Sequence, residues 1–388
     1  MENVQKYYIV TYGCQMNVHE SEKLAGICEK MGYTLADSRE EADLIIFNTC
    51  AIREGAEERV FGNVGALKKL KKQKKDMIIA LCGCMTQKQQ TAEYMLKTFP
   101  FVDIVIGTFN LPNFQSYVEA VKAGRKLQKD KKAKRKLELL EEGDIDESQP
   151  YLRTSGENAW VNIMQGCNNF CTYCIVPYVR GREKSRKEEN ILSEIKEIIQ
   201  SEKYKKITLL GQNVNSYGKD LTPSVSFSKL LSDICALDGD FKLTFMTSHP
   251  KDLTDDLIEV MAKEDKILKE IHLPAQSGNN RILKLMNRNY TREKYLGIIK
   301  KIREKMPNAR LTSDFIVGFP TETEEEFEDT MSLVREVKYD SIFAFMYSPR
   351  EGTVASKMDG QIDQKTKQIR VNKLLSLEKE IQAKEGKK

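Results

Sequence analysis

The sequence predicts an α/β protein in which an N-terminal open parallel sheet domain is followed by a partial (β/α)6 barrel. Two observations lead to this fold class. Short apolar and β-branched runs alternate with amphipathic helical stretches through residues 1–123, and the alternation begins again at Ala159 and yields six further strands. Strands that alternate with helices are typical of parallel sheets whose faces are covered by helices. A chain of 388 residues is long enough for both domains.

The first predicted domain spans residues 1–123. Its expected strands are Tyr7–Tyr12, Asp43–Asn48, Met77–Leu81 and Val102–Ile106, and its expected helices lie at about 18–31, 53–72, 86–98 and 110–123. A lysine-rich and then acidic stretch at 124–150 shows no strand pattern. We interpret this stretch as a charged linker between the two domains.

The second predicted domain spans residues 151–388. Its expected strands are Trp160–Met164, Ile207–Leu210, Lys242–Met246, Glu270–Leu273, Leu311–Val317 and Ile342–Tyr347. Helical patterns lie between or after them, as at Glu188–Ser201, Thr291–Lys305, Thr323–Val337 and Asp363–Lys384. Six β-α units suit an incomplete barrel that is two units short of the eightfold form.

Composition excludes several classes of protein. The nine cysteines are an odd number, no apolar run approaches the length of about 18 residues that a membrane span needs, and Met1–Val10 lacks a basic-then-apolar signal. These features argue against a secreted disulfide protein and against a membrane protein, so we expect a cytoplasmic protein. Because the chain has only three histidines, a thiolate metal site is favoured over an imidazole site.

Charge is distributed unevenly along the chain. The 62 Lys and Arg residues exceed the 57 Asp and Glu residues only slightly, for a net charge of +5, yet Lys68–Lys75 and Lys122–Lys136 are strongly basic. Each run has two interpretations: a solvated helix face or linker, or a contact for a polyanion such as RNA.

Three cysteines form a compact motif after the first strand of the predicted barrel. Cys167, Cys171 and Cys174 have the spacing C-x3-C-x2-C. They are expected on a loop at the carboxyl end of the strand, where barrels place their chemistry. Three soft thiolates this close suit an iron–sulfur cluster, because a structural zinc ion would need a fourth ligand that no nearby His or Cys supplies. Three ligands for a four-iron cluster leave one iron open.

Three more cysteines, Cys14, Cys50 and Cys84, each follow the end of an apolar strand. The carboxyl ends of parallel strands lie along one edge of a sheet, so the three thiols are expected to converge on a second metal site. Cys82 competes with Cys84 for the third position, but Cys84 lies beyond the strand and is favoured. Cys28 and Cys235 lie on apolar helix faces and are expected to be core residues.

At the barrel loop the sequence resembles the radical S-adenosylmethionine enzymes, whose motif is C-x3-C-x-(aromatic)-C, with Tyr173 in the aromatic position. The resemblance implies that Cys167, Cys171 and Cys174 are catalytic and hold a 4Fe-4S cluster whose open iron binds S-adenosylmethionine. One electron then cleaves this cofactor to a 5′-deoxyadenosyl radical. Tyr173 is expected to pack on the adenine of the cofactor or, alternatively, to be a simple packing residue.

A second three-cysteine site joined to such a barrel is the arrangement of the methylthiotransferase family, and this resemblance covers nearly the whole chain. The matching segments include GCQMN at Gly13–Asn17, NTCAIREGAEERVFGNVG at Asn48–Gly65 and, further along, VPYVRGREKSR, LLGQNVNSYG, DFIVGFPTETEEEF and YSPREGT. The first two segments are similar to the bacterial branch that acts on isopentenylated adenosine in tRNA.

The resemblance implies two 4Fe-4S clusters and two uses of S-adenosylmethionine to methylthiolate C2 of N6-dimethylallyl adenosine, an unpaired base next to the tRNA anticodon. The implied partners are the tRNA anticodon stem-loop and an electron donor such as flavodoxin or ferredoxin, for a monomeric enzyme. One alternative is the same chemistry on threonylcarbamoyl-adenosine or on a ribosomal protein aspartate. An alternative of another class is a non-catalytic iron–sulfur protein that binds RNA or transfers electrons, but it would need fully ligated clusters.

Polar residues at the ends of barrel strands are the remaining candidates. The expected cofactor-binding residues are Gln212, Asn213, Gln276, Asp314 and Arg186, although some could contact the tRNA base or cap helices instead. Arg180 and Arg182 also follow the cluster loop and could hold a carboxylate or tRNA phosphates, or could be solvated loop charges. His249 and His272 end strands, but they do not suggest a general base.

Relatives of this family usually continue into a small β-barrel that grips tRNA, the TRAM domain. After the charged helix at Asp363–Lys384 we find no all-β pattern, so we expect the TRAM domain to be absent. The basic runs would then carry more of the phosphate contact, and this contact would weaken with salt.

Overall fold

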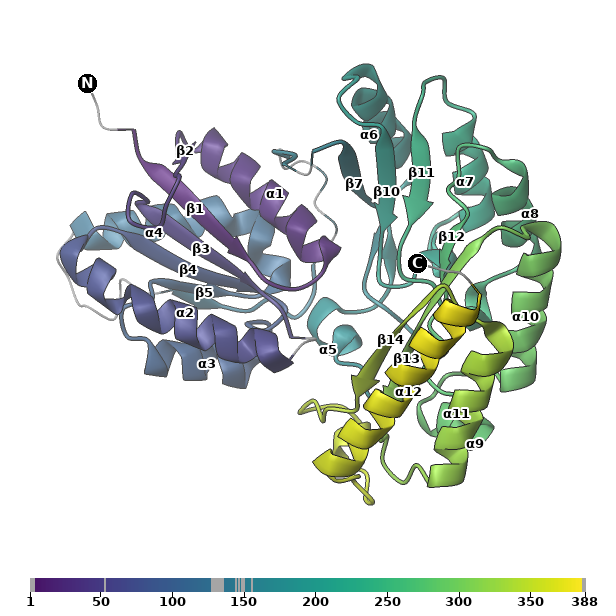
Figure 1. Cartoon of the computed structure of the whole chain (residues 1–388). Coiled ribbons are helices and arrows are strands. Elements are labelled where there is room, and N and C mark those ends of the chain that lie inside the picture. The colour runs from purple at the N-terminus through teal and green to yellow at the C-terminus, as the bar shows by residue number, and fades with distance from the viewer. Residues whose placement is uncertain are drawn as a thin grey trace. The chain divides into compact units, whose positions relative to one another are not determined.

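Figure 1 shows a computed structural model of the chain, which describes residues 4–51, 54–126, 136–143, 145, 147, 151–154 and 156–385. The chain divides into two compact units. The sheet unit consists of Met1–Gly156 and Tyr178–Lys184, and the barrel unit consists of Glu157–Pro177 and Ser185–Lys388. The short helix α5 (Val176–Arg180) therefore begins in the barrel unit and ends in the sheet unit.

The sheet unit is a six-stranded parallel sheet covered by helices on both faces (Figure 1). Its strand order is β2-β1-β3-β4-β5-β6. The strands are β1 (Lys6–Thr11), β2 (Thr34–Leu35), β3 (Leu44–Thr49), β4 (Ile78–Gly83), β5 (Ile104–Ile106) and β6 (Lys136–Glu138). Helices α1 (Gln15–Lys30) and α4 (Phe114–Lys126) pack on one face. Helices α2 (Glu54–Gln73) and α3 (Gln89–Thr98) pack on the other face.

The predicted parallel sheet is confirmed, but the linker prediction is wrong in one place. Strand β6 lies inside 124–150, and it pairs in parallel with β5 as an edge strand of the sheet. A strand of three residues is too short to show alternation, so the lysine-rich composition hid it. Much of the predicted linker, including residues 127–135 of the second basic run, lies outside the described residues.

The barrel unit contains six main strands in chain order. They are β7 (Asn158–Asn162), β10 (Lys206–Leu210), β11 (Lys242–Phe245), β12 (Glu270–His272), β13 (Arg310–Val317) and β14 (Ser341–Met346). These form two parallel sheets, β11-β10-β7 and β12-β13-β14, and an isolated bridge pairs Leu243 of β11 with Ile267, just before β12. Strand β8 (Met164–Gln165) pairs with β9 (Lys184–Ser185), a short strand at the point where the chain returns from the sheet unit to the barrel unit. The incomplete barrel predicted from six β-α units is confirmed.

Helices cover the outer face of these strands and form one large core with them. They are α6 (Glu188–Gln200), α7 (Phe227–Cys235), α8 (Asp255–Lys263), α9 (Asn280–Leu285), α10 (Arg292–Lys305), α11 (Glu324–Val337) and α12 (Gln364–Lys384). Helix α11 begins at a capping box between Thr323 and Glu326, which fixes its start at the predicted position. Among the described residues, no helix is both long and apolar enough to cross a membrane.

Candidate functional site

Cys14, Cys50 and Cys84 lie at one edge of the sheet unit, directly beyond three neighbouring strands. Strand β3 pairs with β1 on one side and with β4 on the other, so the three strand ends are adjacent. The thiols of Cys50 and Cys14 lie close enough to Cys84 to raise the pKa of its thiol electrostatically. Cys82, in contrast, lies within β4 and packs in the core beneath α1 and α4, as does Cys28. Cys235 lies in the barrel core.

Two glycines shape the turns that present these cysteines. Gly13 and Gly83 directly precede Cys14 and Cys84, and both have positive φ angles, +112° and +100°. A Cβ atom on Gly83 would lie 2.4 Å from the carbonyl oxygen of Thr49, and one on Gly13 would lie 2.8 Å from the sulfur of Cys50. The turns therefore require glycine for two reasons, backbone conformation and close approach.

Gly83→Ala is expected to destabilise the sheet unit by more than about 1 kcal/mol, because the new methyl group meets backbone atoms and the φ angle disfavours an L-residue. The measurement is chemical denaturation followed by the circular dichroism of the metal-free protein. Gly62→Ala is the matched control, since Gly62 lies within α2 with open space around it. That substitution is expected to stabilise the helix slightly. Equal effects of the two substitutions would contradict the prediction.

The buried side chain of Asn17 ties the ends of β1 and β3 together. Its Nδ2 donates to the carbonyl oxygens of Tyr12 (2.9 Å) and Thr49 (2.9 Å). The amide of Asn48 donates back to the carbonyl oxygen of Asn17 (2.8 Å). These bonds satisfy backbone groups that the strands leave behind where their ladders end. Asn17 belongs to the GCQMN segment, but no local sequence pattern indicates this structural role.

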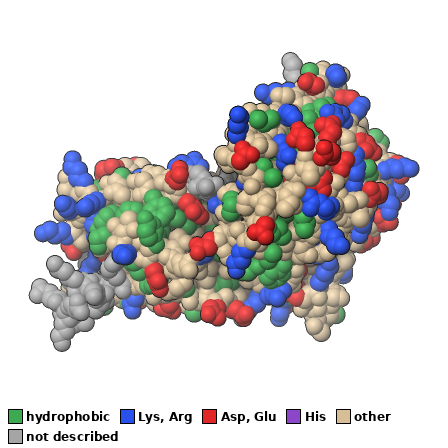
Figure 2. Space-filling view, turned by 90° about the horizontal axis from the view of Figure 1, so that it is seen from below, with side chains coloured by type: hydrophobic (Ala, Val, Ile, Leu, Met, Phe, Trp, Pro, Cys, Tyr) green, Lys and Arg blue, Asp and Glu red, His purple; other side chains and the backbone are tan. Residues whose placement is uncertain are grey.

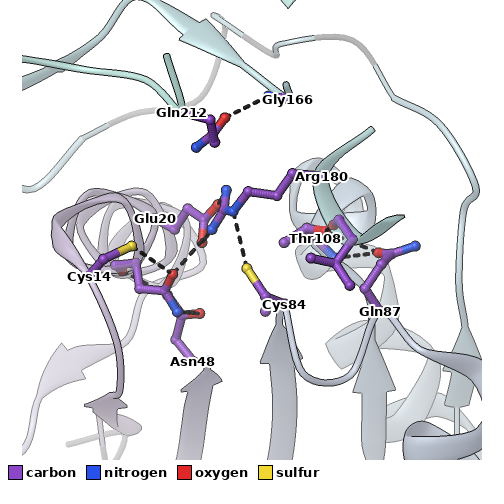
Figure 3. Close-up of polar contacts among 12 residues, drawn as sticks. Cys14, Glu20, Asn48, Cys84, Gln87, Thr108, Gly166, Arg180 and Gln212 are labelled. Atoms are coloured by element: carbon purple, nitrogen blue, oxygen red, sulfur yellow. Dashed lines mark hydrogen bonds and ion pairs between the residues drawn. The ribbon is translucent and has the colours of Figure 1, made fainter. Parts of the chain in front are cut away.

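Arg180 is buried beside the same cysteines (Figure 3). Its Nε donates to the sulfur of Cys84 (3.1 Å), and Nη2 donates to Oδ1 of Asn17 (3.1 Å). Nη1 and Nη2 donate to the two carboxylate oxygens of Glu20, at 2.6 and 3.2 Å. The carboxylate that Arg180 contacts is therefore that of Glu20 on α1, so its charge is balanced within the sheet unit.

The chemistry of this donor set fits an iron–sulfur cluster. Burial raises the pKa of the Cys84 thiol to about 12, and the nearby positive charge of Arg180 opposes the rise. Metal ligation needs the thiolate, which Arg180 stabilises. Among the described residues, no three Cys, His, Asp or Glu side chains surround one point as a single metal ion requires. A four-iron cluster does not require this, because each cysteine binds a different iron.

The second cysteine triad lies in the barrel unit on the loop that follows β8. Cys171 and Cys167 lie near Cys174, and the pKa of Cys174 is raised to about 12 by burial and by these thiols. The end of α9 fixes the loop, since Thr172 donates to the carbonyl oxygens of Leu285 and Met286. Asn287 donates to the carbonyl oxygens of residues 169 and 170 (3.0 and 3.1 Å). The predicted loop position of the three cysteines is thus held from outside the motif.

Arg288 is a buried residue that the sequence analysis missed. Its Nη1 donates to the sulfur of Cys171 (3.5 Å), Nη2 donates to the carbonyl oxygen of Pro274 (2.8 Å), and Nε donates to the hydroxyl of Tyr290 (3.1 Å). Each cysteine triad thus has one buried guanidinium at one of its sulfurs. Arg288 follows Cys171 by 117 positions, so no pattern near the cysteine motif points to it.

The predicted cofactor-binding residues that follow β10 and β12 lie close to the cluster loop or keep unpaired polar atoms. Oε1 of Gln212 accepts a hydrogen bond from the backbone N–H of Gly166 (2.6 Å), directly before Cys167 (Figure 3). In the part of the chain that the structure describes, Oδ1 of Asn213 and Oε1 of Gln276 are buried without a hydrogen-bond partner. A buried acceptor without a donor is costly unless a ligand completes it.

The remaining candidates make contacts of different kinds. Arg186 is buried, and its Nη1 donates to Glu194 and to the carbonyl oxygen of Asn162, both at 2.6 Å, so its charge is balanced within the barrel. Asp314 lies 3.5 Å from Nε2 of His272. Tyr173 is half-buried and packs on an apolar cluster of Ile282, Met286, Phe319, Tyr347 and Ala355.

Several side chains of the two basic runs form ion pairs or hydrogen bonds within the sheet unit. Lys71 pairs with Asp103 (2.8 Å), and Lys74 donates to three carbonyl oxygens between β2 and β3. Arg125 pairs with Asp103 as well (2.6 Å). Lys68, Lys69, Lys72 and Lys75 are exposed. Figure 2 shows Lys and Arg side chains interspersed with Asp and Glu on the face that it draws, as the small net charge of +5 leads one to expect.

Comparison with known families assigns both units. Residues 161–334 match the Radical SAM superfamily, and residues 6–107 match the uncharacterized protein family UPF0004. The chain is 54% identical over 385 residues to a tRNA-2-methylthio-N(6)-dimethylallyladenosine synthase of Clostridium botulinum (strain Okra), covering 99% of this chain and 84% of that protein. A synthase of the same name from Carboxydothermus hydrogenoformans is 52% identical, covering 97% and 84% of the two chains.

Solved structures show the same fold at low sequence identity. The radical S-adenosylmethionine methyltransferase TsrM of Kitasatospora setae has a TM-score of 0.63 and 12% identity, over 91% of this chain and 74% of that one. The cobalamin-dependent radical enzyme OxsB has a TM-score of 0.61 and 12% identity, over 97% and 56% of the two chains. At such identities the likeness establishes the fold only.

Proposed function

Because this chain belongs to the family of tRNA-2-methylthio-N(6)-dimethylallyladenosine synthases, which are radical SAM enzymes, we propose that its two cysteine triads divide one reaction between them. The reaction is the methylthiolation of C2 of N6-dimethylallyl adenosine in tRNA. The observation that carries the proposal is the pair of cysteine triads, each with a buried guanidinium at one sulfur.

When bound, two 4Fe-4S clusters and S-adenosylmethionine supply a one-electron cleavage, a hydrogen abstraction and a transferable methylthio group. Cys167, Cys171 and Cys174 hold the cluster of the barrel unit, and Cys14, Cys50 and Cys84 hold that of the sheet unit. Arg288 and Arg180 each donate a hydrogen bond to one ligand sulfur, which helps to set the reduction potential of the bound cluster.

The cofactor is held by residues around the barrel loop. The unpaired acceptors of Asn213 and Gln276 are suited to the amino group and ribose hydroxyls of S-adenosylmethionine. Gln212 fixes the backbone before Cys167, and Tyr173 offers an aromatic face two residues beyond Cys171. Arg186 is kept as a cofactor-binding candidate because it follows the cysteine loop in the sequence. Its charge is already balanced by Glu194.

The partner is tRNA, whose anticodon stem-loop presents the target base unpaired. The exposed lysines of α2 offer positive charge for phosphate contact, and a flavodoxin or ferredoxin is the proposed electron donor to a monomeric, cytoplasmic enzyme. Two three-cysteine sites also argue against a passive electron carrier, whose clusters would be fully ligated.

Deleting the gene from its host is expected to abolish 2-methylthio-N6-dimethylallyl adenosine in the tRNA and to leave N6-dimethylallyl adenosine in its place. Mass spectrometry of tRNA nucleosides measures both. Complementation with the wild-type gene restores the product, whereas Cys171→Ala does not, because the barrel cluster loses one of three ligands. Accumulation of an unmethylthiolated threonylcarbamoyl adenosine instead would assign the enzyme to that substrate.

A further inference from the structure

Two phenylalanines of the barrel unit are exposed side by side on β14. Phe343 and Phe345 have exposed fractions of 51% and 46%. Among the described residues, these are the two phenylalanines with exposed side chains. Ile342, which precedes Phe343 on the strand, is buried. Helix α12 packs on this face of β14, and the Ile342 amide donates to Glu378 of α12 (2.7 Å). The two exposed rings therefore share the opposite face of the strand.

The register of β13 and β14 shows what surrounds the rings. Phe343 pairs with Asp314, and Phe345 pairs with Ile316, so these four side chains lie on one face of the sheet. His272 completes the group, since its ring contacts the ring of Phe343 with centroids 6.2 Å apart. We name these residues the β14 strip: His272, Asp314, Ile316, Phe343 and Phe345.

The β14 strip adjoins the apolar cluster that packs against the cysteine loop. Ile316 packs against the same apolar cluster as Tyr173, which lies between Cys171 and Cys174. Ala355 belongs to that cluster, and its amide donates to the carbonyl oxygen of Thr172 (2.8 Å). A ligand on the strip would thus lie along the same side of the barrel as the loop that carries the radical chemistry.

We propose that the β14 strip binds the N6-dimethylallyl adenine of tRNA and that Asp314 excludes bases whose N6 substituent carries a carboxylate. The inference rests on the proposed function and adds the residues that select its substrate. Aromatic side chains stack on bases of any sequence, and an apolar five-carbon substituent gains by contact with phenylalanine and isoleucine. A threonylcarbamoyl group would place its carboxylate beside that of Asp314, and such repulsion provides specificity against the wrong substrate.

The test compares two ligands on reconstituted holoenzyme with S-adenosylmethionine bound. Fluorescence anisotropy measures the affinity for an anticodon stem-loop with and without the dimethylallyl group. The wild-type protein is expected to prefer the dimethylallyl form. Replacing both Phe343 and Phe345 by Ala is expected to reduce this preference at least tenfold, which corresponds to about 1.4 kcal/mol. Ile369→Ala, which truncates an equally exposed apolar side chain on α12, is the matched control and keeps the preference.

Asp314→Asn provides the second arm. Removing the charge is expected to shift the ratio of the two affinities several-fold toward the threonylcarbamoyl stem-loop. An unchanged preference in the double Phe variant would overturn the proposal. If the double Phe variant instead loses affinity for S-adenosylmethionine, the proposal is also overturned, because the strip would then hold the cofactor. If the wild-type enzyme does not methylthiolate dimethylallyl adenosine at all, the proposed function fails, whatever the strip binds.

Discussion

Replacing Cys14, Cys50 and Cys84 together by Ala is expected to lower the iron content of the anaerobically reconstituted protein from about eight to about four atoms per chain. The three thiols are the only protein ligands proposed for the cluster of the sheet unit, so that cluster is lost while the barrel cluster stays. Cleavage of S-adenosylmethionine should persist and the methylthio product should disappear. Iron and sulfide assays and nucleoside mass spectrometry measure these quantities.

Cys82→Ala is the matched control for this experiment. Cys82 lies two residues before Cys84 on the same strand, but its side chain is in the core and its sulfur points to the carbonyl oxygen of Phe47 (3.6 Å). The variant is expected to keep about eight irons, although the missing sulfur lowers its stability slightly. A triple variant that still binds about eight irons, or a control that loses half of them, would show that the ligands were assigned wrongly.

Replacing Arg180 by Met is expected to destabilise the sheet unit by about 3–5 kcal/mol, because it leaves the buried carboxylate of Glu20 without its cation. Hydrogen exchange of amides in β1, β3 and β4 of the metal-free protein reports this loss locally. The double variant Glu20→Gln with Arg180→Met is expected to recover most of the stability, since neither charge remains. It should not recover the hydrogen bond to Cys84.

The matched control is an ion pair at the surface in which the charged atoms are the same distance apart. Lys6 and Glu41 lie 2.6 Å apart, as Arg180 and Glu20 do, but the side chains of the first pair are 40% and 46% exposed. Lys6→Met is therefore expected to leave exchange in the strands unchanged. If Arg180→Met behaves like Lys6→Met, Glu20 is not held by Arg180 in solution. If the double variant is as unstable as the single one, packing and not charge explains the loss.

Local patterns were sufficient for most of the fold. The positions of the long strands and helices follow from alternation and from caps such as Thr323, because these signals act within a few residues. The end of β4 shows the limit of this approach. The strand was predicted to end at Leu81 and continues to Gly83, yet Cys84 still follows its end because Gly83 adopts a conformation that ends the strand.

The residues around the two triads depend on contacts that no local pattern contains. Glu20 and Arg180 are 160 positions apart, and nothing near Arg180 indicates that the chain re-enters the sheet unit there. Arg288 lies 117 positions from Cys171. The exposed rings of β14 look like ordinary core residues of a buried strand, since their exposure depends on which face α12 covers.

The re-entry of Tyr178–Lys184 into the sheet unit limits how this protein can be divided. Thr108 donates to the carbonyl oxygen of Val179 (2.7 Å), and Lys184 donates to that of Gly143 (3.2 Å), so the segment is fastened on both sides of Arg180. A fragment that stops at Gly156 would lack the guanidinium and leave the Glu20 carboxylate without its ion-pair partner. Chimaeras that exchange the N-terminal half between relatives should therefore exchange 178–184 with it, as a graft of two non-contiguous pieces.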